Sequence, residues 1–114
     1  MRKTLTIFFI FFSLSIFSQE ANSWQIKQAK KISDFVSDKH DLSEDDSKFF
    51  YNAQLNQIVE NALKIKELGA SKPEEKRPIY RQGFNNLKSI LTERFGSELA
   101  NELMKSSNLA IVKI

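Results

Sequence analysis

Residues 42–69 read LSEDDSKFFYNAQLNQIVENALKIKELG and predict one long amphipathic helix. Ser43 is a suitable N-cap residue, and Asp46 stands at the N3 position, as in a capping box with Asp in place of the usual Glu or Gln. Gly69 can supply the left-handed residue that ends a helix. About 25 residues at 1.5 Å rise make a rod of roughly 37 Å. Apolar residues recur along it at spacings of three and four, at Tyr51, Leu55, Ile58, Ala62 and Ile65.

A shorter helix is predicted before this one, over residues 23–37. Residues 19–68 contain no Gly or Pro, so no residue of this stretch opposes helix strongly. Asn22 or Ser23 can cap the start, and the polar residues 38–41 are expected to form a turn. The apolar positions again have helical spacing, at Ala29, Ile32, Phe35 and Val36.

Residues 69–78 hold both prolines and separate the long helix from a third one. Ser71 and Glu74 have capping-box spacing, with Pro73 in the first turn. Pro78 leaves two alternatives, because it either kinks this helix after one turn or begins it, with residues 71–77 forming a separate turn. An apolar row with helical spacing follows at Tyr80, Phe84, Leu87 and Leu91.

The start of a fourth, short helix has two candidates. Leu91-Thr92-Glu93-Arg94 resembles a capped helix start, and Gly96-Ser97 offers a competing one. This helix would carry Leu99, Leu103 and Met104, and an extended tail is considered for residues 107–114. We therefore predict an all-α chain, a long helical hairpin of three to four amphipathic helices.

The N-terminus predicts export. Arg2 and Lys3 precede 13 uncharged residues, LTIFFIFFSLSIF at positions 5–17, which suits a signal peptide over residues 1–18 cleaved between Ser18 and Gln19. The alternative is an uncleaved membrane anchor, although this run is shorter than the roughly 20 residues of a spanning helix. We expect one domain, residues 19–114, in the periplasm or outside the cell. Membrane contact is expected only through residues 1–18, if they stay attached.

Charge and composition exclude several classes of function. Residues 1–18 hold two of the 17 basic residues and none of the 14 acidic ones, so the net charge falls from +3 to +1 without them. Charge therefore does not favour nucleic-acid binding. There is no Cys, one His and no Gly-rich phosphate loop, which argues against thiolate chemistry, a two-His metal site and a nucleotide site. We predict no enzyme, no cofactor and no metal.

Two segments carry a resemblance to a known family. Leu42-Ser43-Glu44-Asp45-Asp46 and Leu91-Thr92-Glu93-Arg94-Phe95 are two Leu-Ser/Thr motifs about 50 residues apart in a small exported helical chain. They resemble the two Leu-Thr-x-x-Gln motifs of the Spy/CpxP family of periplasmic proteins, with Asp46 and Phe95 at the Gln positions. The resemblance implies a bent helical hairpin and a role as a chaperone or an envelope-stress regulator.

Four aromatic residues are candidate contacts for a client or partner: Phe49, Phe50, Tyr80 and Phe84. Successive helical residues point about 100° apart, so the consecutive rings of residues 49–51 cannot share one narrow stripe. Phe49 is expected to point away from the seam, either covered by the first helix or another subunit, or exposed as a binding contact. The acidic residues 41–46 are explained by helix capping. His40 is expected in a solvated turn, and the basic run at 72–81 on a solvated helix start.

These features favour a binding protein. The leading hypothesis is a Spy/CpxP-like periplasmic chaperone or stress-signalling adaptor that holds a protein client or a sensor domain without ATP. The alternative is a structural or oligomerisation bundle with no client. A homodimer is also expected, because the apolar seam is wider than one hairpin partner can cover and 96 residues without disulfides have little core.

Overall fold

The computed structural model describes residues 21–113, which form four α-helices and no strand. The helices are α2 (Ser23–His40), α3 (Glu44–Leu68), α4 (Pro73–Phe95) and α5 (Ser97–Lys113). The predicted all-α class is therefore confirmed. The predictions for residues 1–18 lie outside the described residues. No described helix is both long and apolar enough to cross a membrane.

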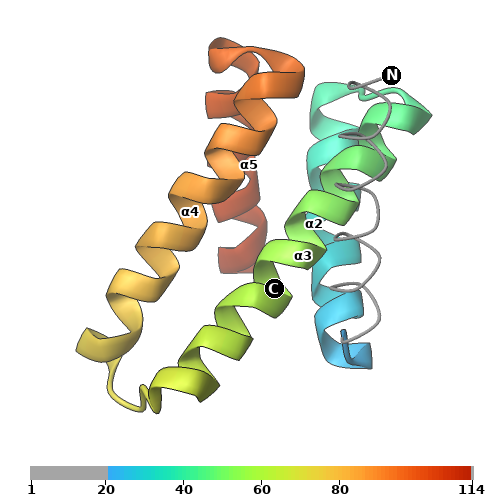
Figure 1. Ribbon diagram of the computed structural model, residues 1–114. Coiled ribbons are helices and arrows are strands. Elements are labelled where there is room, and N and C mark those ends of the chain that lie inside the picture. Colours follow the sequence, from blue (N-terminus) through green and yellow to red (C-terminus); the bar gives the residue numbers. More distant parts are fainter. Residues whose placement is uncertain (1–20, 114) are drawn as a thin grey trace, which may run out of the picture.

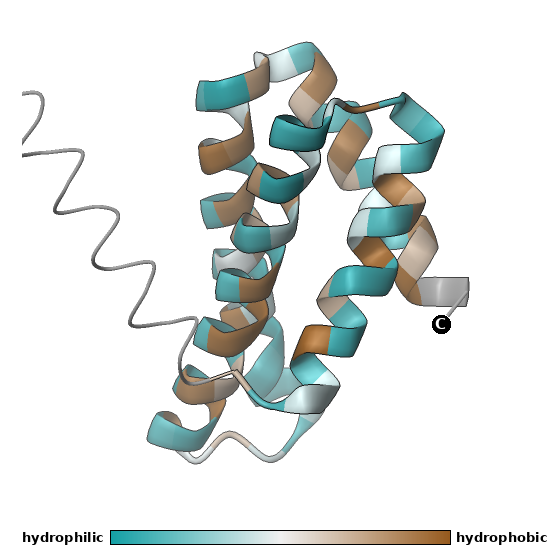
Figure 2. Cartoon of the chain, turned by 90° about the vertical axis from the view of Figure 1, so that its right-hand side faces the viewer, coloured by the Kyte–Doolittle hydropathy of each residue, from teal (hydrophilic) through white to brown (hydrophobic). Residues whose placement is uncertain are grey.

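The four helices form a ring in which each packs against two others. α2 contacts α3, α3 contacts α4, α4 contacts α5, and α5 returns to α2. Consecutive helices run in opposite directions (Figure 1). The predicted long hairpin is the α3–α4 pair, and α2 and α5 complete the bundle beside it. Hydrophobic and hydrophilic residues interchange along each helix (Figure 2), the pattern by which helices of a bundle bury one face.

The first predicted helix is confirmed, with a later end. The Asn22 side chain accepts from the Gln25 backbone N–H at 2.8 Å, and the Gln25 side chain accepts from the Asn22 N–H at 2.9 Å. α2 continues to His40 and ends at Asp41, whose φ is 53°. The turn predicted at 38–41 was wrong for its first three residues, because His40 lies in the last helical turn and bonds to Ser106 of α5 at 2.7 Å.

The long helix has the predicted ends. The Ser43 Oγ accepts from the Asp46 N–H at 3.1 Å, and Gly69 stops α3 with a φ of 65°. The predicted seam was only partly right, since Leu55 is buried but Ala62 is exposed. α3 touches two helices rather than one, so it also buries a second set of residues: Phe50, Ala53, Gln54, Gln57 and Val59.

α4 begins one residue further along than its predicted cap. Glu75, not Glu74, accepts from the backbone N–H groups of Lys72 and Ser71, at 3.0 and 3.2 Å. These two donors, that of Lys72 first, hold the pKa of the Glu75 carboxyl below its ordinary value. The helix then runs without interruption through Pro78, so the alternative in which it begins at Pro78 is wrong.

The junction between α4 and α5 lies at Gly96, the second of the two predicted starts. Leu91 is fully buried and extends the apolar face of α4 beyond Leu87, so the first start was wrong: Leu91 and Thr92 do not cap a helix. The second Leu-Thr motif thus lies in the last turns of α4. The chain is helical through Lys113, which replaces the extended tail considered for 107–114.

The larger of the two apolar clusters among the described residues lies mainly in the half of the bundle that contains the α2–α3 loop and the α4–α5 junction. Phe50, Ile32, Leu91 and Leu103 are its largest fully buried side chains. Val36, Ala53, Leu87, Ala100, Met104 and Ala110 complete this cluster. We call this half of the molecule the closed end. The opposite half contains the start of α2, the α3–α4 loop and the end of α5.

Candidate functional site

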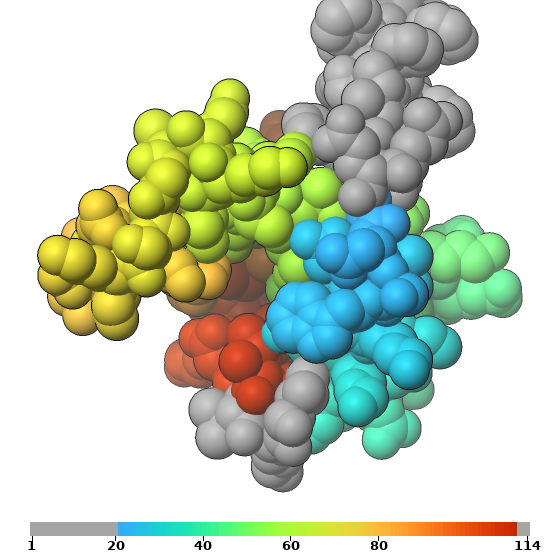
Figure 3. Space-filling view, turned by 90° about the horizontal axis from the view of Figure 1, so that it is seen from below, coloured from blue at the N-terminus to red at the C-terminus, as the bar shows by residue number. Residues whose placement is uncertain are grey.

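A cleft of about 470 Å³ lies between all four helices in that opposite half, which we call the cleft end. Seen from below the bundle, the surface is hollowed between α5 and the α3–α4 pair, beside the start of α2 (Figure 3). The volume falls within the range of about 300–1,000 Å³ typical of ligand pockets. The cleft is the strongest candidate site because it is both concave and apolar.

Among the described residues, none of those that line the cleft is charged. Its apolar walls are formed by aromatic and aliphatic side chains, chiefly Trp24, Ile58, Ile65, Tyr80, Phe84 and Ile111. Between them stand uncharged polar side chains: Gln25, Gln28, Gln54, Gln57, Asn61, Ser107 and Asn108. Amides both donate and accept hydrogen bonds. The cleft is therefore suited to apolar groups attached to a neutral polar chain, and a charge placed inside it would lose its hydration without a partner.

Gly83 lets α3 and α4 approach each other at the cleft wall. A Cβ at this position would overlap the Asn61 side chain and lie 2.7 Å from Gln57 Nε2. These two amides are bonded to each other, with Gln57 donating to Asn61 Oδ1 at 3.0 Å. The missing side chain thus makes room for a pair of amides that line the cleft.

The inner end of the cleft is closed by a buried hydrogen bond. Ser107 of α5 donates to Gln54 Oε1 of α3 at 3.3 Å, across the middle of the ring. Among residues 21–113, each side-chain hydrogen bond that joins two helices lies at this level or nearer the closed end. Within this part of the chain, packing and the α3–α4 loop hold the helix ends around the mouth of the cleft.

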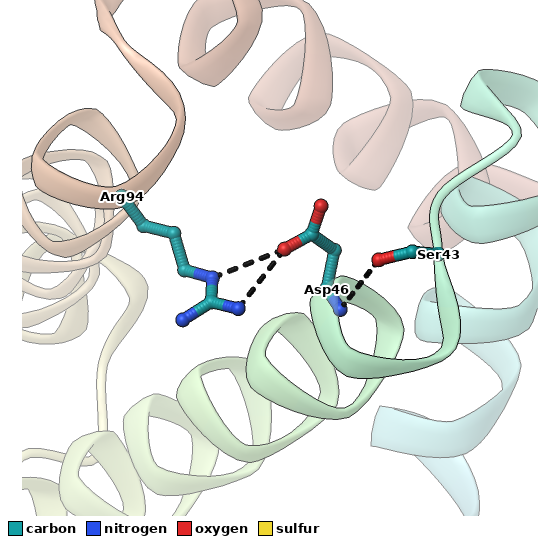
Figure 4. Close-up of polar contacts among 3 residues, drawn as sticks. All are labelled: Ser43, Asp46 and Arg94. Carbon is teal, nitrogen blue, oxygen red and sulfur yellow. Dashed lines mark hydrogen bonds and ion pairs between the residues drawn. The ribbon is translucent and has the colours of Figure 1, made fainter.

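The closed end, by contrast, is fastened by an ion pair. Arg94 of α4 donates from Nε and Nη2 to Asp46 Oδ1 of α3, at 3.2 and 3.0 Å, while the Asp46 backbone N–H is capped by Ser43 (Figure 4). The Arg94 guanidinium also lies 4.5 Å above the Phe49 ring, which meets Phe95 edge-on at 6.0 Å. One cluster therefore joins the start of α3 to the end of α4.

Replacing Ser43 with alanine tests the cap in this cluster. We expect Ser43→Ala to lower the free energy of unfolding by about 1 kcal/mol, because the Asp46 N–H loses its acceptor. Ser43→Asn keeps an acceptor at the same place and should lie within a few tenths of a kcal/mol of the parent. Urea denaturation of the three proteins measures the difference. Equal losses for both variants would contradict the capping role of the Ser43 hydroxyl.

The four predicted aromatic contacts separate into two pairs. Tyr80 and Phe84 are 51% and 39% exposed and line the cleft together. Phe50 is fully buried in the core, so it is not an available contact and that prediction was wrong. Phe49 is half-buried beneath Arg94 and against Phe95. It is covered by α4, whereas the sequence led us to expect the first helix or a second subunit.

The other polar residues that the sequence analysis considered contribute to the structure of the bundle. His40 is half-buried and bonded to Ser106 instead of lying in a solvated turn. At the start of α3, Ser43 caps the Asp46 N–H as predicted, but the Asp46 carboxylate pairs with Arg94 instead of completing a capping box. Among the described residues, no three His, Asp or Glu side chains are grouped so as to hold a metal ion.

Comparison of the chain with protein-family models, with curated proteins and with solved structures finds no match. The site therefore has to be interpreted from its own geometry. Sequence reasoning missed most of the cleft. The sequence feature that could have indicated the cleft is a set of amide side chains on the inner faces of α2 and α3: Gln25, Gln28, Gln54, Gln57 and Asn61.

Proposed function

We propose that this protein is an exported helical binding protein that holds apolar segments of other polypeptides in the cleft, without ATP. The observation that carries the proposal is the uncharged cleft between four helices, whose mouth exposes Trp24, Tyr80 and Phe84. Rigid aromatic side chains supply large contact areas at low entropic cost, and they dominate many binding interfaces. Amides on the same walls can pair with the backbone of a bound segment.

The two ends of the bundle differ in how firmly polar contacts join their helices, and this difference supports the proposal. The closed end carries the core and the Arg94–Asp46 ion pair, so it can hold the fold while the cleft is open. Among residues 21–113, no comparable polar contact joins the helix ends at the mouth. Small rotations of the helices there would let the cleft fit segments of different shape, as a chaperone or an adaptor requires.

Within this proposal, the protein acts as a periplasmic chaperone or stress-signalling adaptor of the Spy/CpxP kind. The supporting observations are the predicted signal peptide, the Leu42–Asp46 cap and the all-helical fold. The homodimer expected from the sequence stays a prediction.

An aggregation assay tests the function. The purified protein should suppress aggregation of an unrelated unfolding protein, and Tyr80→Ala with Phe84→Ala should raise the dose required by about tenfold, because two aromatic anchors are lost. Ile90→Ala is the matched control: Ile90 lies on the same helix, is 41% exposed and is outside the cleft. It should not change the dose.

Thermal melts of both variants separate lost binding from lost folding, since all three side chains are substantially exposed. A parent protein that suppresses no aggregation at any dose would contradict the proposed function. It would favour the structural bundle instead. Equal effects of the cleft variant and of Ile90→Ala would place the binding surface elsewhere.

A further inference from the structure

Charge is unevenly distributed between the two ends of the bundle. Residues 22–31, 60–82 and 104–111, which form the cleft end, contain ten Lys or Arg against four Glu. Residues 32–59 and 83–103, which include the closed end and the inner part of the cleft wall, contain four Lys or Arg against nine Asp or Glu. The formal net charges are thus +6 and −5. The near-neutral total conceals this separation.

Most of the cations at the cleft end have no acidic partner. Lys30 and Lys64 pair with acidic residues one turn away, and Lys105 pairs with Glu102. The other seven form no ion pair with a described residue: Lys27, Lys31, Lys66, Lys72, Lys76, Arg77 and Arg81. The Glu75 carboxyl accepts hydrogen bonds from the backbone at the start of α4 and forms no ion pair with these cations.

Two of these cations lie directly beside the cleft. Lys76 and Arg77 line a shallower hollow of about 360 Å³, together with Ser71, Pro73 and Tyr80. Tyr80 is common to both hollows, because its side chain also forms the cleft wall. One ring therefore separates an uncharged apolar site from a positively charged one. A ligand that fills both must carry an apolar group and an anionic group next to each other.

We propose that the cleft end binds an acidic polypeptide segment. Its apolar side chains enter the cleft, and Asp or Glu residues beside them pair with Lys76 and Arg77. This inference rests on the proposed function and specifies the chemistry of the client. The concave shape favours a polypeptide over a membrane surface, because inserted side chains fill a hollow whereas membranes take up protruding ones. The unpaired cations would also steer acidic partners toward this end.

Binding of three fluorescent peptides to the full-length protein tests this inference. The peptides share one central set of Phe and Leu residues and differ in their flanks, which are Asp and Glu, Ser and Gly, or Lys. At about 50 mM salt, we expect the acidic peptide to bind at least about tenfold more tightly than the neutral one, and the basic peptide most weakly. At about 300 mM salt, the preference should shrink, because exposed charges are screened.

Variants that remove positive charges test which residues cause the preference for the acidic peptide. Lys76→Ala with Arg77→Ala should abolish most of the preference for the acidic peptide and leave the affinity for the neutral peptide unchanged. Lys48→Ala with Lys88→Ala removes the same charge from exposed positions at the closed end and should preserve the preference. Tyr80→Ala with Phe84→Ala should weaken all three peptides.

The outcomes distinguish the two proposals. Equal affinity for acidic and neutral peptides would overturn the inference while leaving the proposed function intact. Absence of binding to any peptide would overturn both. Tighter binding to anionic phospholipid vesicles than to the acidic peptide would show that the cations face a membrane, and would also overturn the inference.

Discussion

Phe50→Ala is expected to lower the free energy of unfolding by about 3–5 kcal/mol, the range measured for truncating buried aromatic residues. Phe50 is fully buried in the closed-end core. Removing its ring forfeits the burial of a large apolar group and leaves a void among neighbours that collapse only partly. A domain of this size has a total stability of about 5–15 kcal/mol. The variant should therefore unfold at a much lower urea concentration.

Leu68→Ala is the control for this prediction. Leu68 lies at the end of the same helix and is 72% exposed, so its truncation should change stability by no more than about 0.5 kcal/mol. Urea denaturation monitored by circular dichroism gives both values. If Phe50→Ala unfolded at nearly the same urea concentration as Leu68→Ala, the Phe50 ring would not be enclosed. Phe50 would then again be a candidate binding contact.

The helix ends that the sequence predicted well are those marked by local chemistry. Ser43 and Gly69 bound α3 as expected, because capping and a left-handed stop depend on residues within one turn. The helix start predicted at Leu91-Thr92 was wrong because the contacts that exclude it are not local. A Leu-Thr pair before acidic residues is a generic start signal, and only burial of Leu91 in the core shows that α4 continues past it.

The cleft was harder to predict than the helices. Tyr80, Phe84, Leu87 and Leu91 form one periodic row, and periodicity assigns all four to a buried face. Leu87 and Leu91 are buried, whereas Tyr80 and Phe84 are exposed at the cleft. Whether a row of this kind meets a neighbouring helix depends on how the helices diverge, which is a tertiary property. Phe84 was proposed as a contact from its residue type, without any knowledge of the cleft.

The separation of charge between the two ends of the bundle was not predicted from the sequence. Every charged residue is visible in the sequence, yet the near-neutral net charge hides two ends of opposite sign. The antiparallel helices place residues 22–31 and residues 60–82 at the same end of the bundle, although the two segments are distant in the chain. The sequence supplies the charges, and the topology decides which of them act together.

Gly96 is expected to be sensitive to substitution because of its backbone angles. Its φ of 87° and ψ of 159° lie in a region that is essentially restricted to glycine. Its N–H bonds to the Thr92 carbonyl and its own carbonyl accepts from the Ala100 N–H, both at 2.9 Å. The residue therefore ends α4 and begins α5 at once. An L side chain here opposes the backbone angles that turn the chain.

We expect Gly96→Ala to lower the free energy of unfolding by about 1–3 kcal/mol, the typical cost of holding a residue in a disfavoured backbone region. Open space surrounds the site of the added Cβ, so the loss would reflect backbone strain alone.

Gly69→Asn is the matched control. Gly69 has φ 65° and ψ 28°, and asparagine tolerates this left-handed conformation at a helix end. Its effect should therefore be smaller than that of Gly96→Ala. Urea denaturation of both variants decides the point: a Gly96→Ala protein as stable as the parent would mean that the α4–α5 junction does not require glycine, and that the two helices can be joined with ordinary backbone angles.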